Sequence, residues 1–384
     1  MKKICFIMTD SISFNVLCRD QLEFFTQMEG VDLTLICGGS PHNIEILKKR
    51  NVGKVIYFPL IRKPSLFLDL FCLIKLFLFF VFNRFDLVVY STPKALLLCS
   101  IATFFSFQKK RLAIVQGRVY ENFYGLKKAL FQILDKISFL FSTKVLFVSR
   151  SLMNISIFEN LVSEKKSFVI NEGSFNGVDL DKFIPVNAEC KRRLREKWGI
   201  KENIFTICTV GRLCKDKGIE ELQDIIANFT GKEIYFLIVG SIEDQFSEKI
   251  LSNILKNSNV KHIDHIDHVE EVFQISDLHL FLSYREGFGN VAIEAASCNV
   301  PTFAYDVTGI KDSVNHGVTG LRFEFKDIHS ISAEIEKSVK HPILFKEKFS
   351  KSRDWAVKNF EQEKVWENYL NFYKETINNG LNRD

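Results

Sequence analysis

Two glutamates in the segment Ser283–Ala295 have the type and spacing to bind hydroxyl groups. Glu286 lies where a short apolar strand is expected to end, and Glu294 follows eight positions later. A helix is expected to begin between them, near Gly289 or Asn290. Free N–H groups at a helix start, together with the helix dipole, suit a phosphate or a sugar oxygen. One carboxylate could therefore hold hydroxyls of a sugar and the other hydroxyls of a ribose.

A structural role is the alternative for both carboxylates. Glu286 could cap its turn, and Glu294 could be a solvated residue of the helix. The second alternative is weakened by the small and apolar neighbours of Glu294, which are Ala292, Ile293, Ala295 and Ala296.

A basic loop, Val210–Gly218, follows another apolar strand. Gly211 would let the backbone approach a ligand, and Arg212 and Lys217 place two cations at the end of that strand. Paired cations of this kind stabilise a diphosphate as it gains charge. A solvated basic loop is the alternative.

The elements that must position these residues alternate between short apolar strands and longer helices. The strands are predicted at 4–8, 32–37, 55–58, 87–90, 112–116, 144–148, 167–170, 204–210, 234–239, 260–263, 278–282 and 302–305. Helices are predicted between them, notably at 218–229 and 289–297. This alternation indicates parallel sheets covered on both faces. Ligands of such sheets bind beyond the carboxyl ends of the strands.

The chain is long enough for two such domains, and a join is predicted near 173–199. That stretch contains Asn176-Gly177, Pro185 and a charged run. We predict an α/β chain of two doubly wound, Rossmann-like domains that face each other across a cleft, 1–175 and 176–361. The tail 345–377 is predicted to be helical and to carry a stripe of aromatic residues. Its last part, about 362–384, is expected to pack back on the first domain.

Composition limits the classes of partner. The net charge of +5 over 384 residues suits a phosphate-bearing ligand or an anionic membrane, and it is too small to indicate nucleic acid. The nine cysteines form no CxxC pair, which indicates reduced core thiols in a cytoplasmic protein. The run 66–82 is rich in Leu and Phe but carries Asp69 and Lys75. It could be a core helix or an interfacial helix on a membrane, and it is too short and charged to predict a span.

Taken together, the two motifs resemble those of the family 4 glycosyltransferases, which have the GT-B fold. The E-x7-E pattern corresponds to Glu286 and Glu294, and the G-R…K-G element to 211–218. The resemblance extends to 176–179, 239–240, 306–309 and 317–320, and so covers nearly the whole chain. It implies a donor site for a nucleotide-sugar, which we expect to be a UDP-sugar. The implied donor-site residues are Gly211, Arg212, Lys217, Glu286, Gly287, Phe288, Gly289, Asn290 and Glu294.

By this resemblance, Arg212 and Lys217 bind the donor diphosphate, Glu294 binds the ribose, and Glu286 binds the transferred sugar. The resemblance also implies retention of anomeric configuration without a metal or other cofactor. The acceptor then attacks from the face that the phosphate leaves, and the departing diphosphate oxygen can take its proton. Glu286, Arg212 and Lys217 are the catalytic candidates, with Glu286 orienting the sugar instead of acting as a nucleophile.

The first half departs from the wider family. Its first loop, 9–15, has no glycine, and no histidine occurs between His42 and His262. The segments 92–95, 117–121 and 148–152 resemble a subgroup that assembles bacterial O-antigen and capsular polysaccharide. The implied acceptor is a saccharide on polyprenyl diphosphate, at the inner face of the cytoplasmic membrane. Ser11, Arg118 and Glu121 are the acceptor-site candidates, although Arg118 could equally be a surface arginine.

A metal site and three other functions are the alternatives to a transferase. A metal site could be suggested by His262, His265 and His268, because histidines three positions apart can meet on a helix. This segment is instead predicted to be a strand that continues into a loop. A nucleotide-sugar 2-epimerase would need a histidine in the first domain, and a phosphorylase would need a phosphate site. A non-catalytic scaffold would be expected to have lost some of the motif residues.

Overall fold

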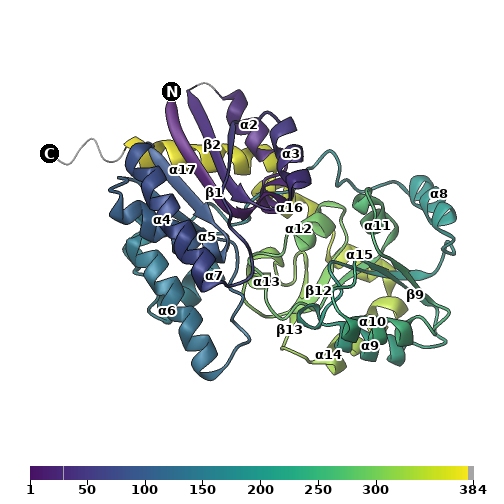
Figure 1. The fold of residues 1–384 in the computed structure, drawn as a ribbon. Coiled ribbons are helices and arrows are strands. Elements are labelled where there is room, and N and C mark those ends of the chain that lie inside the picture. Colours follow the sequence, from purple (N-terminus) through teal and green to yellow (C-terminus); the bar gives the residue numbers. More distant parts are fainter. Residues whose placement is uncertain (29, 379–384) are drawn as a thin grey trace. The chain divides into compact units, whose positions relative to one another are not determined.

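The computed structural model describes residues 1–28 and 30–378. The chain divides into two compact units, Met1–Asn176 with the C-terminal segment from Glu363, and Gly177–Gln362. These bounds differ by one residue from the expected ones. Each unit is a parallel α/β layer structure (Figure 1), so the α/β fold predicted from the alternation of strands and helices is confirmed.

The first unit contains a seven-stranded parallel sheet with strand order β3-β2-β1-β4-β5-β6-β7. Its strands are β1 (Lys2–Asp10), β2 (Val31–Gly38), β3 (Lys54–Tyr57), β4 (Leu87–Ser91), β5 (Arg111–Val115), β6 (Lys144–Phe147) and β7 (Ser167–Val169). Its helices are α1 (Ser11–Leu17), α2 (Gln21–Gln27), α3 (Pro41–Lys49), α4 (Leu66–Phe82), α5 (Pro93–Phe105), α6 (Gly125–Phe141), α7 (Arg150–Phe158) and α17 (Gln362–Asn378). The central strands are buried on both faces, which explains their continuous apolar sequences.

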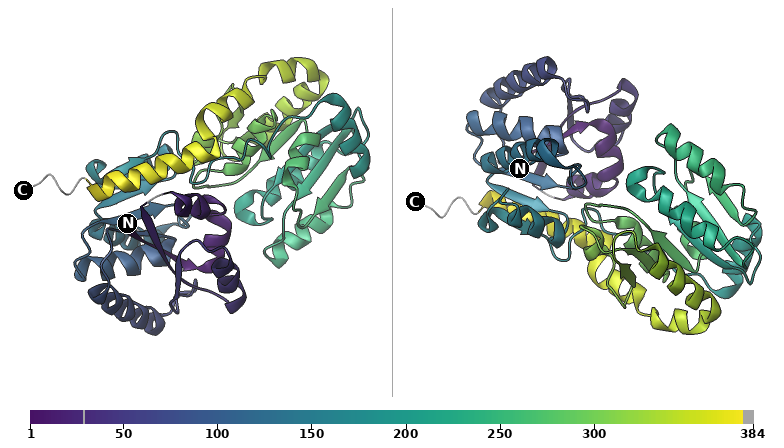
Figure 2. Two further views of the ribbon diagram at one scale, coloured as in Figure 1. Left: turned by 90° about the horizontal axis from the view of Figure 1, so that it is seen from above. Right: turned by 90° about the horizontal axis from the view of Figure 1, so that it is seen from below.

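Helix α17, near the C-terminal end of the chain, packs on the first unit (Figure 2). The Trp366 ring lies 5.5 Å from the Phe24 ring of α2 in a tilted contact, and its ring N–H donates to the Asn176 side chain at 2.8 Å. Tyr373 lies 5.8 Å from Phe25, measured between ring centroids. The aromatic stripe of the tail is therefore core packing. The part of the predicted tail helix at 379–384 lies outside the described residues.

The second unit contains a six-stranded parallel sheet with strand order β10-β9-β8-β11-β12-β13. Its strands are β8 (Phe205–Val210), β9 (Ile234–Val239), β10 (Val260–Ile263), β11 (Leu278–Phe281), β12 (Thr302–Tyr305) and β13 (Gly320–Phe323). Its helices are α8 (Ala188–Trp198), α9 (Ile219–Asn228), α10 (Gln245–Ile254), α11 (Val269–Ile275), α12 (Asn290–Ser297), α13 (Ile310–Ser313), α14 (Ile328–Lys340), α15 (Pro342–Lys348) and α16 (Ser352–Phe360).

Three sequence expectations need correction. Strand β13 was not predicted, because three of its four residues are only half-buried and its apolar signal is weak. Cys190 is exposed on α8, whereas the other cysteines are buried as expected. Arg118 is not a surface arginine, since only 3% of its surface is exposed.

Candidate functional site

The two sequence motifs of the second unit meet at one edge of its sheet. Strands β8 and β11 are parallel neighbours, so the loops that follow them leave the sheet side by side. Lys217, at the end of the short 3-10 helix Lys215–Lys217, forms an ion pair with Glu286 in the turn after β11. Both side chains are mostly buried, with about a fifth of each exposed. Lys217 and Glu286 are 69 positions apart in sequence, but their side chains meet at the carboxyl edge of the sheet.

A second pair joins the same two loops. The Arg285 guanidinium donates to the Asp216 carboxylate at 2.7 Å, and the Tyr284 N–H donates to the Asp216 carbonyl at 2.9 Å. The Tyr284 hydroxyl donates to the buried carboxylate of Glu221 on α9 at 2.6 Å. These bonds fix the residues that precede Lys217 and Glu286, so the backbone that carries both candidate side chains is held in place.

Gly309 supports the Glu286 turn from the other side. Its φ is +81°, and a Cβ there would lie 2.4 Å from the Glu286 carbonyl oxygen. Only glycine tolerates both this backbone conformation and this approach. Gly211 differs, because a Cβ there would meet nothing within 4 Å. The space beside Gly211 is open, as the sequence motif suggested for a ligand that approaches the backbone.

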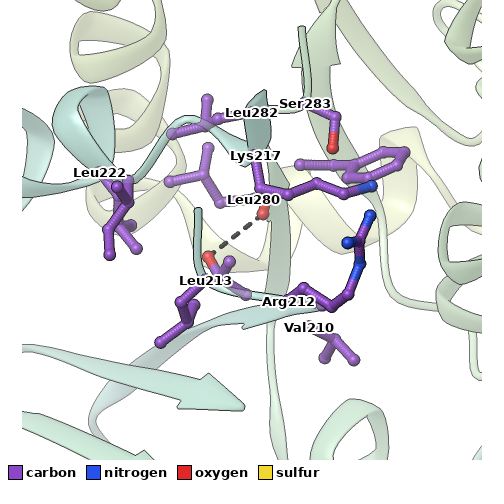
Figure 3. Close-up of a pocket in the computed structure, with 12 residues that line it drawn as sticks. Val210, Arg212, Leu213, Lys217, Leu222, Leu280, Leu282 and Ser283 are labelled. Atoms are coloured by element: carbon purple, nitrogen blue, oxygen red, sulfur yellow. Dashed lines mark hydrogen bonds between the residues drawn. The ribbon is translucent and has the colours of Figure 1, made fainter. Parts of the chain in front are cut away.

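Arg212 lies beside a small pocket of about 20 Å³, room for a single water. Figure 3 shows that Arg212 and Lys217 extend to the same side of this pocket. Arg212 is exposed and pairs with Glu243. Burial acts to lower the pKa of Arg212, but the hydrogen bond and charge of Glu243, with a smaller effect of Glu286, raise it above its usual value. The guanidinium is thus a cation on a side chain that is 61% exposed.

The remaining donor-site candidates occupy the start of α12. Gly289 is the N-cap of this helix, with φ +92°, and Asn290 is its first residue. Phe288 is buried and its ring lies 5.2 Å from the ring of Phe360, so only its backbone is available to a ligand. Glu294 is half-buried on α12 between buried alanines, which contradicts the solvated alternative. Gly287 is half-buried in the turn.

The acceptor-site candidates lie in the first unit, at the carboxyl ends of β1 and β5. Ser11 is fully buried as the first residue of α1, and Glu121 is half-buried in the loop after β5. Arg118 is in the same loop and forms an ion pair with Glu159 at the end of α7. Strand β4 separates β1 from β5, so Ser11 and Arg118 come from strands that are not neighbours.

Arg118 belongs to a cluster that sequence reasoning missed. Its guanidinium lies 4.7 Å from the centre of the Tyr120 ring, and Tyr120 donates a hydrogen bond to Asp135 of α6. Lys128 lies 3.2 Å from the Glu159 carboxylate. Burial raises the pKa of Asp135 to about 6, although the bond from Tyr120 opposes this shift. The members come from three segments, which are the loop after β5, helix α6 and the end of α7, and no local pattern links all three.

Comparisons with known proteins identify the family. Residues 191–355 match the family model described as glycosyl transferases group 1. The chain is 31% identical over 384 residues to the capsular polysaccharide biosynthesis glycosyltransferase CapM of Staphylococcus aureus, with 98% of each chain covered. The chain belongs to the group 1 glycosyltransferases.

Other relatives of this glycosyltransferase carry more specific names. It is 24% identical to the N,N'-diacetylbacillosaminyl-diphospho-undecaprenol alpha-1,3-N-acetylgalactosaminyltransferase of Campylobacter jejuni, over 70% of this chain and 71% of that protein. Its fold matches Anabaena HepE, solved in complex with UDP and glucose, with a TM-score of 0.79 and 18% identity. That match covers 98% of this chain and all of HepE. The GT-B fold expected from the motifs is therefore confirmed.

The three histidines that could suggest a metal, His262, His265 and His268, lie on β10 and in the segment after it. His262, on β10, contacts the Gly240 carbonyl oxygen through its ring nitrogen at 2.9 Å. His265 and His268 are exposed and lie beside Asp267 and Glu270. Within residues 1–28 and 30–378, no group of three or more His, Cys, Asp or Glu side chains is placed to hold a metal ion. Over the same residues, no helix is long and apolar enough to cross a membrane.

Proposed function

We propose that this glycosyltransferase moves a hexose or N-acetylhexosamine-type sugar from a UDP-sugar to a saccharide on polyprenyl diphosphate. The product would be an intermediate of surface polysaccharide, either capsule or O-antigen. The names of CapM and of the Campylobacter transferase support the pathway and the lipid-linked acceptor. The UDP in HepE supports the nucleotide. We further propose that the enzyme works on the inner face of the cytoplasmic membrane.

The pairing of Lys217 with Glu286 carries the proposal. The ammonium of Lys217 pairs with the carboxylate that is expected to orient the sugar. A donor that enters this edge would place its diphosphate against Lys217 and Arg212, and its sugar against Glu286. Glu294, half-buried on α12, would take the ribose hydroxyls.

The chemical step follows from this placement. As the bond between the sugar and the diphosphate breaks, negative charge collects on the diphosphate, and the two cations stabilise it. Glu286 lies on the sugar side and stabilises the positive charge that develops on the ring. The acceptor hydroxyl attacks the same face and passes its proton to the departing phosphate oxygen. Configuration is then retained. Because the cations come from the protein, the proposed reaction needs neither a metal nor another cofactor.

Transfer assays with Glu286→Ala test this function. The enzyme is incubated with labelled UDP-sugars and polyprenyl-diphosphate saccharides, with and without EDTA. We expect EDTA to leave transfer unchanged and Glu286→Ala to abolish it at an unchanged melting temperature. Glu233→Ala, an exposed glutamate before β9, is the control and should transfer normally. Near-normal activity of Glu286→Ala would refute the assignment, and an inactive wild type that binds no nucleotide would indicate a scaffold.

A further inference from the structure

Helix α4 exposes an apolar surface that the rest of the first unit does not cover. Of its 17 residues, only Cys72, Leu76 and Phe80 are buried, which form a single stripe toward the core. Leu73, Phe77 and Phe79 are half-buried. The remaining apolar residues of α4 are exposed, with Phe67 88% exposed. Soluble proteins rarely leave large apolar patches open, and those that remain mark interaction sites.

Helix α6 shows the same feature in a more regular form. Leu126, Leu130, Ile133 and Leu140 are all exposed, and Leu126 is 90% exposed. Their spacing of three, four and seven positions puts them on one face of a helix. The residues that α6 buries are Ser138 and Phe139. The apolar stripe of α6 therefore points to solvent, opposite to the usual arrangement on a domain surface.

These two surfaces belong to one side of the first unit. Helix α5 lies between α4 and α6 and contacts both of them (Figure 1). At its end, the Phe104 ring lies 4.6 Å from the Phe141 ring of α6. Phe105 and Phe107 add exposed rings at the same end. We call the exposed apolar residues of α4, α6 and the end of α5 the α4–α6 face.

The charge of residues 61–141 indicates which kind of partner the α4–α6 face would bind. Residues 61–141 contain twelve Lys and Arg against four Asp and Glu, a net charge of +8 in a chain whose total is +5. Asp69, which lies within α4, is paired with Lys94 at 2.6 Å. Long cationic side chains can lay their stems on an apolar surface and keep their charges at its rim. Two copies of this segment would repel each other, whereas an anionic lipid surface would attract it.

We propose that the α4–α6 face docks on an anionic lipid bilayer, with the outward sides of α4 and α6 lying in the headgroup region. Helices that lie in this region combine an apolar face with basic residues, as here. Both helices follow strands and so begin on the carboxyl side of the sheet, which also carries Ser11 and Arg118. Docking would therefore bring this edge to the lipid surface. This last step rests on the proposed function; the binding itself does not.

Vesicle sedimentation of the full chain tests the inference. The vesicles contain phosphatidylcholine alone or mixed with phosphatidylglycerol, at low and high salt. The double variant Phe67→Asp with Leu126→Asp removes one exposed apolar side chain from each helix. The control is Ile343→Asp with Leu344→Asp, at exposed apolar positions of α15 in the second unit. Melting temperatures check that all three proteins are folded.

We expect the wild type and the control to bind phosphatidylglycerol vesicles, and the α4–α6 variant to bind at least about tenfold more weakly. High salt should weaken binding. Equal binding of the variant and the wild type would overturn the inference, as would a wild type that ignores anionic vesicles. An oligomer that the variant dissociates, without vesicle binding, would assign the face to a second copy. Vesicle binding without nucleotide binding would refute only the proposed function.

Discussion

The ion pair between Lys217 and Glu286 leads to a prediction about ligand exchange. Glu286 pairs with Lys217, so it should compete with an incoming diphosphate for the same ammonium group. Removing Lys217 deletes one charge-assisted hydrogen bond to the diphosphate, which contributes about 1.5–3 kcal/mol. At about 1.4 kcal/mol per factor of ten, Lys217→Ala should weaken UDP binding roughly 10- to 150-fold.

Glu286→Gln should act differently on the same measurement. It removes the competing carboxylate and leaves Lys217 in place. Ion pairs that are partly exposed contribute up to about 1 kcal/mol, so UDP should bind equally well or up to about fivefold more tightly. Sugar transfer should nevertheless be lost. One variant is thus expected to keep or gain nucleotide affinity while it loses catalysis.

Isothermal titration calorimetry with UDP, in buffer containing EDTA, measures both effects. Lys215→Ala is the matched control, because Lys215 belongs to the same short helix and is exposed, with Glu220 as its partner at 3.3 Å. Its affinity for UDP should stay within about twofold of the wild type. Unchanged affinity in Lys217→Ala would refute the role of Lys217. A loss in Glu286→Gln as large as that in Lys217→Ala would refute competition between the carboxylate and the diphosphate.

Three further predictions concern the scaffold. Gly309→Ala should cost about 1–3 kcal/mol and reduce transfer, because its Cβ would displace the Glu286 turn; normal melting and normal activity together would contradict this. Trp366→Ala should cost about 3–5 kcal/mol in urea unfolding, since α17 loses its contacts with Phe24 and Asn176; a loss below about 1 kcal/mol would show that α17 is anchored elsewhere. Burial lowers the pKa of His279 to about 3 in the folded protein. As the pH falls, this histidine is therefore protonated in the unfolded chain before it is protonated in the folded one. Stability should then decrease from about pH 6.5 toward 3, by up to about 1.4 kcal/mol per unit. His279→Gln should reduce that slope, and an unchanged slope in denaturation midpoints would exclude this histidine as its source.

The α/β architecture could be predicted, and the candidate donor loops could be located, because both depend on local sequence patterns. Short buried strands of a parallel sheet are continuous apolar runs, and the helices between them have their own period. Glu286 and Glu294 belong to one strand, turn and helix, so their spacing alone places them on one edge. Strand β13 was not predicted, because its formation depends on pairing with β12 more than on its own four residues.

The contacts between distant segments could not be predicted in this way. In the sequence, Arg118 is only a basic residue in a loop. The fold buries it against Glu159, which is 41 positions away. The sequence also left open whether 66–82 is a core or an interfacial helix. The structure shows that only one stripe of α4 is covered and that the apolar stripe of α6 is exposed.

The sequence by itself thus determined the fold class and the family, and it named the candidates for the donor site. Residue type and spacing along one element are sufficient for these. The tertiary structure decided which of these residues touch. Lys217 meets Glu286 because β8 and β11 are neighbours in the sheet, an order that strand pairing sets and local sequence does not. It also decided which apolar surfaces remain open, because burial depends on what packs against a helix as well as on its own residues.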